Sequence, residues 1–482
     1  MVYKSKHSVQ ERGDFSFDFE TAGARLEAGQ SFRLGITAPQ KRVIISLLTG
    51  FGICGLLQPA LLCAAFAWGL FTAFGALITW RTLLISAGML RRARFSVRPV
   101  HRIPDEELPV YSILVAAYDE APLMPQLAAA LARLDWPPDR LEILILIEAH
   151  DGLTRTAAEA TRFPVRTRLL TVPPGGPLTK PNALNHGFAQ ARGDYVVIYD
   201  VEDLPAPDQL RRAHAAFVSA PEDLICLQAR LQADNPKASW LAAQWALEYD
   251  LQFGLLLPGT ALCRAPLLLG GTSNHFRRKA LIALGGWDAY NVTEDADLGM
   301  RIARAGLRAD TFASTTLEDA PAHWRVWLPQ RGRWIKGYIQ TWLVLMRTPS
   351  RTLQEMGSLR ILAMQCALGG AILAPLSHAV LILLVLAAAL SSYISIGAAL
   401  LSFLISCYAI RLIVDLAAPV AWSWQRALAA ITKPLYWPLL SIAAVHAVWD
   451  LAKRPHFWAK TPHSPRNAEP DQTCSTGSSA SA

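Results

Sequence analysis

The sequence predicts an α/β domain with a parallel sheet, inserted between groups of membrane-spanning α-helices. Strand-like and helix-like segments alternate over residues 100–350, which is typical of a parallel sheet with right-handed crossovers and helices on both faces. Residues 43–90 and 360–450 form two long apolar blocks, and about 20 apolar residues suffice to span a bilayer. A strand predicted at 195–199 ends in carboxylates, and ligands of open α/β sheets bind at such strand ends.

The composition fits a membrane protein. The chain has 482 residues, too many for one compact core, with 52% hydrophobic and 17% charged residues. Its net charge is +8, and beside apolar blocks we expect basic residues to mark cytoplasmic flanks, not a nucleic-acid surface. The seven cysteines have no zinc or redox spacing, so we expect them to be reduced and to serve in packing.

The first apolar block has room for two helices, near 43–61 and 64–88, in a tight hairpin. Gln58-Pro59 interrupts the block, and basic residues flank it on both sides. This charge distribution predicts two spans with both ends cytoplasmic, and hence a cytoplasmic N-terminal segment over 1–42. One long tilted span is the alternative, and it would put one basic cluster outside. No cleavable signal peptide is expected.

The middle region carries the elements of the predicted sheet. Runs of β-branched and aliphatic residues predict strands, and segments with proline near the first turn predict helices. The expected strands are 111–117, 141–147, 168–172, 195–200 and 224–231, and the expected helices are 122–134, 181–191 and 207–217.

The second apolar block, 360–450, is expected to hold three or four spans. A basic segment follows it, so the remaining residues, 453–482, are expected to be cytoplasmic. The tail from about 467 is rich in Ser, Ala and Thr and is expected to be disordered. The candidate spans are 360–377, 378–397, 399–420 and 428–449.

The acidic residues after the 195–199 strand are the first candidate site. Asp200, Glu202 and Asp203 stand at its carboxyl end, where open α/β folds bind ligands. Hard carboxylate oxygens suit Mg²⁺ or Mn²⁺, which in turn can hold a diphosphate. The alternative is a strand that ends in a solvated acidic turn.

Three further loops can serve a nucleotide. Tyr118 and Glu120 follow the first strand and can line a base and ribose, or simply form a βα loop. Glu148 and Asp151 follow the second strand and can accept hydrogen bonds from a base or ribose. Lys180 lies at a helix N-terminus and is a candidate anion site, with a solvated lysine as the alternative.

Two later motifs can serve an acceptor. In Thr293-Glu294-Asp295, Asp295 is a candidate general base, although Thr293 can equally be an N-cap followed by first-turn acids. In Gln330-Arg331-Gly332-Arg333-Trp334, guanidinium groups suit phosphate and the indole suits a pyranose face. The alternative is a basic-aromatic anchor at the membrane interface.

The order of VED, TED and QRGRW between membrane blocks resembles the processive family-2 glycosyltransferases, which include the bacterial cellulose synthases and related β-glycan synthases. This resemblance covers about residues 43–460. It implies a GT-A-type glycosyltransferase domain on the cytosolic face of the inner (plasma) membrane. It also implies a transmembrane channel for the product, amphipathic interface helices at 239–257 and 337–346, and Mg²⁺ or Mn²⁺ as cofactor.

The resemblance also implies roles for individual residues. Asp295 would be the catalytic base, and the loop from Gly270 to His275 would lie beside the acceptor end, with His275 near the metal as a weaker alternative. The sequence departs from the family at the base-binding acid, which is either Glu148 or Asp151, and at the metal motif, whose second acid is glutamate. By this resemblance the nucleotide contacts would be Tyr118, Glu120, Glu148, Asp151, Lys180, Asp200, Gln330, Arg331 and Arg333; the metal contacts Asp200, Glu202 and Asp203; and the acceptor contacts Trp334, Gly271, Thr272 and Glu294.

The implied activity is inverting polymerisation of a nucleotide-activated sugar, with UDP-glucose as the default donor, into a β-linked polysaccharide that crosses the membrane. The partners would be a UDP-sugar, the growing glycan, the bilayer and export proteins, without nucleic acid. Two alternatives stay open: a membrane glycosyltransferase that adds one sugar to a lipid carrier or glycolipid, and a non-catalytic scaffold.

Overall fold

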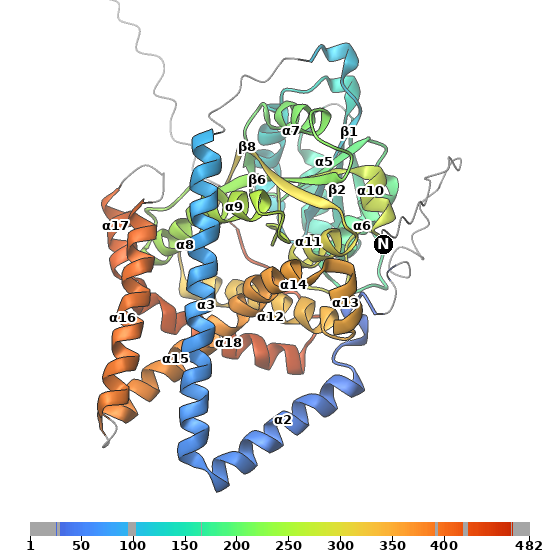
Figure 1. Ribbon diagram of the computed structural model, residues 1–482. Coiled ribbons are helices and arrows are strands. Elements are labelled where there is room, and N and C mark those ends of the chain that lie inside the picture. Colours follow the sequence, from blue (N-terminus) through green and yellow to red (C-terminus); the bar gives the residue numbers. More distant parts are fainter. Residues whose placement is uncertain are drawn as a thin grey trace, which may run out of the picture.

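The computed structural model describes residue 26 and residues 29–94, 103–164, 166–390, 394–417, 423–463 and 465. A sheet-containing domain sits at one end of the molecule, and long helices extend from it (Figure 1). The tail predicted to be disordered from about 467 lies outside the described residues, as do residues 1–25 of the predicted N-terminal segment.

The sheet has eight strands in the order β3-β2-β1-β4-β7-β6-β8-β5. The aliphatic runs predicted as strands all form strands, because they fill both faces of the sheet. The strands are β1 (Tyr111–Ala117), β2 (Leu141–Glu148), β3 (Thr167–Val172), β4 (Tyr195–Tyr199), β5 (Leu204–Pro205), β6 (Leu224–Ala233), β7 (Asn274–Arg277) and β8 (Arg308–Glu318).

The sheet is mixed, whereas the sequence predicted a parallel one. β1, β2, β3 and β4 pair in parallel, as do β6 and β8. β7 pairs antiparallel with both β4 and β6, and β5 pairs antiparallel with β8. β7 is only four residues long, with the polar sequence NHFR, so no hydrophobic alternation marks it in the sequence.

Helices cover both faces of the sheet. On one face Met124, Ala158 and Phe217 belong to a single apolar core, and on the other Phe188, Leu257 and Leu298 belong to a second. The first three residues come from α4 (Met124–Ala132), α5 (Gly152–Ala160) and α7 (Gln209–Val218), and the others from α6 (Lys180–Gln190), α9 (Leu257–Leu262) and α11 (Glu294–Arg304).

A layer of helices lies between the sheet domain and the long apolar helices (Figure 1). The longest of this layer is α12 (Trp324–Leu345), which packs against the last apolar helix through Trp327 and Ile335. The others are α8 (Trp240–Leu251) with a π-helical turn (Gln252–Leu256) before α9, α13 (Pro349–Met356), and α17 (Trp424–Ile431), which packs on α8. The short helix α10 (Arg278–Ala283) instead belongs to the sheet domain, where Leu281 joins the second apolar core (Figure 1).

Four helices in the described residues are long and apolar enough to cross a membrane: Ala38–Leu57, Pro59–Arg92, Ser358–Leu383 and Lys433–Lys453. They belong to α2 (Ala38–Leu57), α3 (Pro59–Arg94), the continuous run of α14 (Ser358–Met364), a π-turn and α15 (Gly370–Ala389), and α18 (Lys433–Lys453). α16 (Ile394–Ala417) is a further long helix.

The apolar helices differ from the predicted spans in two places. α2 and α3 diverge from their junction at Gln58 (Figure 1), and α2 buries no side chain, so they do not form a tight hairpin. The segments 360–377 and most of 378–397 form one helical run, because the uninterrupted apolar sequence gives no boundary between them.

The backbone of α3 packs closely against the π-helical turn and α9. A Cβ atom on Gly88 would lie 2.1 Å from the carbonyl oxygen of Leu255, and one on Gly259 would lie 1.8 Å from that of Leu84. Only glycine permits this approach. The contact fixes the membrane-facing helices relative to the sheet and thus forms one wall of the cavity that follows.

Candidate active site

One continuous cavity of about 520 Å³ runs from the carboxyl ends of β1, β2 and β4 to the space between α3, α15, α16 and α18. It brings together residues that are far apart in the sequence. Of the predicted site residues, Asp151 and Asp203 do not line it. Those that line it are Tyr118, Glu120, Glu148, Lys180, Asp200, Glu202, Gly271, Thr272, Glu294, Asp295, Gln330, Arg331, Arg333 and Trp334.

Lys180 connects two walls of the cavity. As the first residue of α6, it forms an ion pair with Asp200 and donates a hydrogen bond to the carbonyl oxygen of Gly271 at 2.7 Å. Burial alone would lower its pKa, but the charge of Asp200 outweighs this and raises it. Lys180 is therefore a fixed cation at the end of β4, where an anionic donor would bind.

Of the two candidate acids at the end of β2, Glu148 lines the cavity and is the last residue of the strand. Burial raises its pKa above the ordinary value. Asp151 instead caps α5, accepting a hydrogen bond from the Thr154 amide at 3.1 Å, and it also accepts one from the Asp119 amide at 2.6 Å. The structure thus separates the two candidates: Glu148 is available to a ligand, and Asp151 holds the loop that carries Tyr118.

A group of three residues could hold a divalent cation. The ligand atoms of Glu120, Glu202 and His463 all lie within 4.8 Å of one another. Burial, then the charges of Asp200 and Glu120, raise the pKa of Glu202, and burial lowers the pKa of His463, which favours the neutral imidazole that binds metals. A cation would relieve the repulsion between these carboxylates, so the residues fit Mg²⁺ or Mn²⁺.

The two other predicted metal ligands are engaged elsewhere in this arrangement. Asp200 pairs with Lys180. Asp203 is 1% exposed. Its carboxylate accepts one hydrogen bond from the Asp200 amide at 2.7 Å and a second from the Thr272 hydroxyl. Asp203 therefore shapes the turn after β4.

The segment after α18 covers the cavity beside Glu120 and Glu202, a contact that the sequence did not predict. Lys460 donates to the carbonyl oxygen of Asp119 at 2.6 Å and forms an ion pair with Glu120 at 3.0 Å. His463 lies 3.2 Å from Glu202. The sequence predicted only a basic flank here. The signal that could have indicated a role in the cavity is the pair Lys460 and His463, which follows Trp458.

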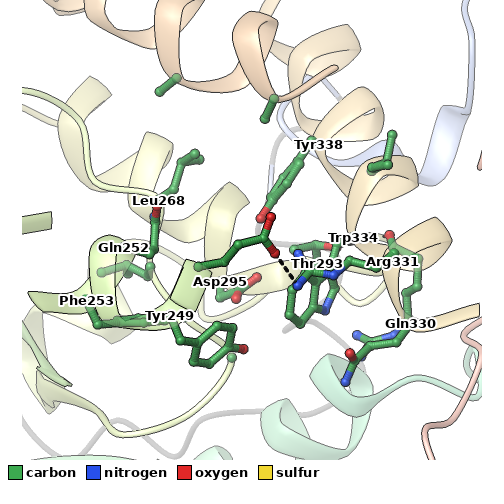
Figure 2. Close-up of a pocket in the computed structure, with 18 of the residues that line it drawn as sticks. Tyr249, Gln252, Phe253, Leu268, Thr293, Asp295, Gln330, Arg331, Trp334 and Tyr338 are labelled. Carbon is green, nitrogen blue, oxygen red and sulfur yellow. Dashed lines mark hydrogen bonds and ion pairs between the residues drawn. The ribbon is translucent and has the colours of Figure 1, made fainter. Parts of the chain in front are cut away.

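Asp295 is the second residue of α11, and its side chain faces the cavity (Figure 2). One carboxylate oxygen accepts a hydrogen bond from the Ala296 amide at 2.8 Å. Burial, followed by the charge of Glu294, raises the pKa of Asp295 to about 7. A carboxylate with this pKa suits general-base chemistry near neutral pH.

The QRGRW segment lies inside α12, whose close packing sets its position against Asp295. A Cβ atom on Gly337 would lie 2.0 Å from the Thr293 hydroxyl oxygen, and that hydroxyl donates to the carbonyl oxygen of Arg333 at 3.4 Å. Glycine at 337 thus allows α12 to contact the start of α11 directly.

Aromatic rings gather beside Asp295, and those of Tyr249 and Trp334 line the cavity. Tyr249 and Trp334 stack with centroids 6.1 Å apart, and Trp245 stacks on Tyr249 at 3.5 Å. Arg331 lies 4.6 Å over the Trp334 ring and pairs with Glu248 at 2.5 Å. Figure 2 shows Trp334, Tyr338 and Asp295 around the same space. Flat rings beside a base suit a pyranose acceptor.

The suggestion that His275 approaches the metal is wrong. His275 belongs to β7 and is fully buried, with its Nδ1 atom 2.6 Å from the Tyr111 hydroxyl and its Nε2 atom 3.2 Å from Gln209 Oε1. Burial lowers its pKa to about 3. The pairing of β7 with β4 and β6 turns this side chain into the core, away from the cavity.

Comparison with known families adds to this geometry. Residues 109–337 match the family described as "Glycosyltransferase like family 2". The chain therefore carries a glycosyltransferase family 2 domain, as the order of its motifs predicted. The fold is GT-A-like and is flanked by long apolar helices, which confirms the predicted fold class. The sheet is mixed, so the prediction of a parallel sheet was wrong.

Several proteins are similar to this chain. A probable glycosyltransferase YdaM of Bacillus subtilis is 27% identical over 48% of this chain and 56% of its own length. Cellulose synthase 1 catalytic subunit (UDP-forming) of Komagataeibacter xylinus is 28% identical over 52% of this chain and 34% of its own length. A β-monoglucosyldiacylglycerol synthase of Synechocystis is 28% identical over 49% of each chain. The matches span between a third and just over half of these relatives.

Among solved structures, a mannosyltransferase of Pyrobaculum calidifontis in complex with GDP-Man and Mn²⁺ aligns with a TM-score of 0.49 and 23% identity, covering 78% of this chain and 99% of its own. Staphylococcus aureus TarS, residues 1–349, aligns with a TM-score of 0.38 and 12% identity, covering 73% of this chain and 93% of its own.

Proposed function

We propose that this chain is a membrane-embedded inverting glycosyltransferase that transfers a sugar from a nucleoside-diphosphate donor to an acceptor hydroxyl. The supporting observation is the single cavity that joins Lys180, Glu202 and Glu148 at one end to Asp295 and Trp334 further along. Cations, acids and a base in one cavity are what such a displacement requires.

The reaction is one displacement at the anomeric carbon. Asp295 takes the proton of the acceptor hydroxyl, whose oxygen forms the new bond to the anomeric carbon. The bond from that carbon to the diphosphate oxygen breaks, and the nucleoside diphosphate leaves with the electron pair. Because attack occurs opposite the leaving group, an α-linked donor gives a β-linked product.

The surrounding side chains stabilise the charge that develops on the diphosphate. Lys180 is already held as a cation by Asp200, and Arg333 is half-buried in α12 beside the start of α11. Glu120, Glu202 and His463 would hold Mg²⁺ or Mn²⁺, which when bound supplies positive charge for the diphosphate.

We propose a growing β-glycan as the first candidate acceptor, with UDP-glucose as the first donor to test. The rings of Tyr249 and Trp334, which line the cavity, favour it, because successive sugars can slide over flat apolar faces. A lipid acceptor is the second candidate, favoured by the apolar extension of the cavity between α3 and α16.

The test uses the full chain purified in nanodiscs with Mg²⁺ or Mn²⁺ and a panel of radiolabelled nucleotide sugars. We expect release of the nucleoside diphosphate from one donor, and a loss of about 10²–10⁴-fold in Asp295→Asn. Product of high molecular weight supports the glycan acceptor, and lipid-extractable product supports the second candidate. No turnover of any donor by the wild type would refute the transferase proposal.

A further inference from the structure

Beyond Trp334, the cavity continues between the apolar helices, and its walls change character. They are formed by apolar side chains such as Leu77 and Ile78 of α3 and Leu404 of α16. Ile410 of α16 also lines the cavity and is 40% exposed. The extension is thus an apolar, partly open space between these helices.

Four cationic side chains line this extension: Arg81 of α3, Arg331 of α12, Arg411 of α16 and Lys433 of α18. Glu248 pairs with Arg331 at 2.5 Å, and Asp415 pairs with Arg411 at 2.8 Å.

These two carboxylates balance only two of the four cations. The group therefore carries an excess of two positive charges, those of Arg81 and Lys433. Arg81 is exposed, whereas Lys433 is buried, where an unpaired charge is costly.

Lys433 shows most clearly that a partner is missing. Its side chain is 1% exposed, and its ammonium nitrogen has no hydrogen-bond partner among the described residues. The centre of the Tyr436 ring lies 5.5 Å from this nitrogen. The nearby charges are those of Glu248, Arg411, Asp415 and Arg331. A buried ammonium group without an acceptor points to an anion that binds from the cavity.

Arg81 supports the same conclusion from the opposite wall. Its guanidinium group is accessible from the cavity, and within the described part of the chain it forms no hydrogen bond or ion pair. It shares the charged neighbours Arg411, Glu248 and Asp415 with Lys433. Because the two cations line the same cavity and share these neighbours, we infer that one anionic group can contact both.

We propose that this extension binds a membrane lipid with an anionic phosphate headgroup, held by Lys433 and Arg81, and that this lipid presents the acceptor. The apolar walls would receive the lipid tail, and the group attached to the phosphate would reach Trp334 and Asp295 past Arg331. The inference rests on the proposed transferase function in its lipid-acceptor form.

Lipid binding by the full chain in detergent, measured by native mass spectrometry, tests the site directly. The probes are dioleoylphosphatidic acid and, as a neutral-headgroup comparison, dioleoylphosphatidylcholine. We expect phosphatidic acid to bind at least about tenfold more tightly, and Lys433→Met to remove that preference. Lys453→Met, at the exposed end of the same helix, is the matched control and should bind like the wild type.

A folding defect would not account for the expected result. Because Lys433 lacks a hydrogen-bond partner, Lys433→Met should leave the thermal stability in neutral detergent unchanged or higher. Arg81→Met, with Arg92→Met as its control, gives an independent second variant. Equal phosphatidic acid binding by Lys433→Met and Lys453→Met would overturn the proposal.

Glycerol phosphate, which has the same anionic group without tails, distinguishes a lipid from a soluble anion. We expect it not to displace phosphatidic acid at equal concentration, because it gains nothing from the apolar walls. Displacement would refute the lipid assignment. Since lipid binding is read without catalysis, failure of the transferase proposal, seen as no nucleotide release by the wild type, remains separate.

Discussion

Gly337→Ala tests whether the contact between α12 and α11 sets the catalytic geometry. The new Cβ atom would lie 2.0 Å from the Thr293 hydroxyl oxygen and 2.3 Å from its Cβ atom. Since non-bonded carbon atoms prefer about 3.5–4.0 Å, the two helices must separate by roughly 1 Å or more. That separation moves Arg333 and Trp334 away from Asp295.

The expected cost appears in both stability and rate. Overpacking of this kind destabilises by about 1–3 kcal/mol, and a misplacement of about 1 Å at a reacting centre can reduce the rate about 10²-fold. The assay is nucleoside-diphosphate release with the donor identified from the panel, together with the thermal unfolding midpoint.

Gly75→Ala is the matched control, because a Cβ atom there meets nothing within 4 Å. It lies inside α3, where alanine is expected to add about 0.5–1 kcal/mol of helix stability. Thr293→Gly added to Gly337→Ala removes the closest atoms and should restore part of the rate. If Gly337→Ala and Gly75→Ala turn over equally fast, the contact does not position the site and the reasoning fails.

Two other predictions concern protons and the metal. Asp295 must be ionised to act as a base, and burial together with the Glu294 charge raises its pKa to about 7. We therefore expect kcat/KM to fall as the pH decreases below about 7 and to level off above it. A kcat/KM that stays constant from pH 5.5 to 8 would contradict this role of Asp295. His463→Ala removes one of the three proposed metal-binding side chains. We therefore expect the Mn²⁺ concentration that gives half-maximal nucleotide release to rise about tenfold. His323→Ala is the control, because His323 does not line the cavity, and it should match the wild type. Identical Mn²⁺ dependence of the two variants would exclude His463 as a ligand.

Local sequence was sufficient for the elements whose burial is uniform. The runs at β1, β2 and β4 are aliphatic or aromatic on both faces, so each could be recognised without knowing its neighbours. The positions of Lys180, Asp200 and Asp295 at the ends of strands and starts of helices followed from the same elements. Because carboxyl ends of parallel strands meet at one edge, their convergence could also be expected.

Elements that depend on distant partners could not be predicted in this way. β7 is four polar residues, and only its pairing with β4 and β6 makes it a strand and turns His275 into the core. β8 has the sequence RADTFASTTLE, which lacks a clear alternation. Because the sequence did not reveal β7, which pairs antiparallel with both its neighbours, it predicted a parallel sheet.

The sequence by itself determined the family-2 domain, most of the sheet and the motifs that carry the proposed chemistry, because these depend on short-range patterns of burial and charge. Only the tertiary structure decided that Glu148 rather than Asp151 faces the cavity, and that His463 lies beside Glu202. It also placed Lys433 and Arg81, from helices far apart in the chain, around one apolar space. Contacts of this kind arise when helices pack, and no local pattern encodes which side chains will then share a cavity.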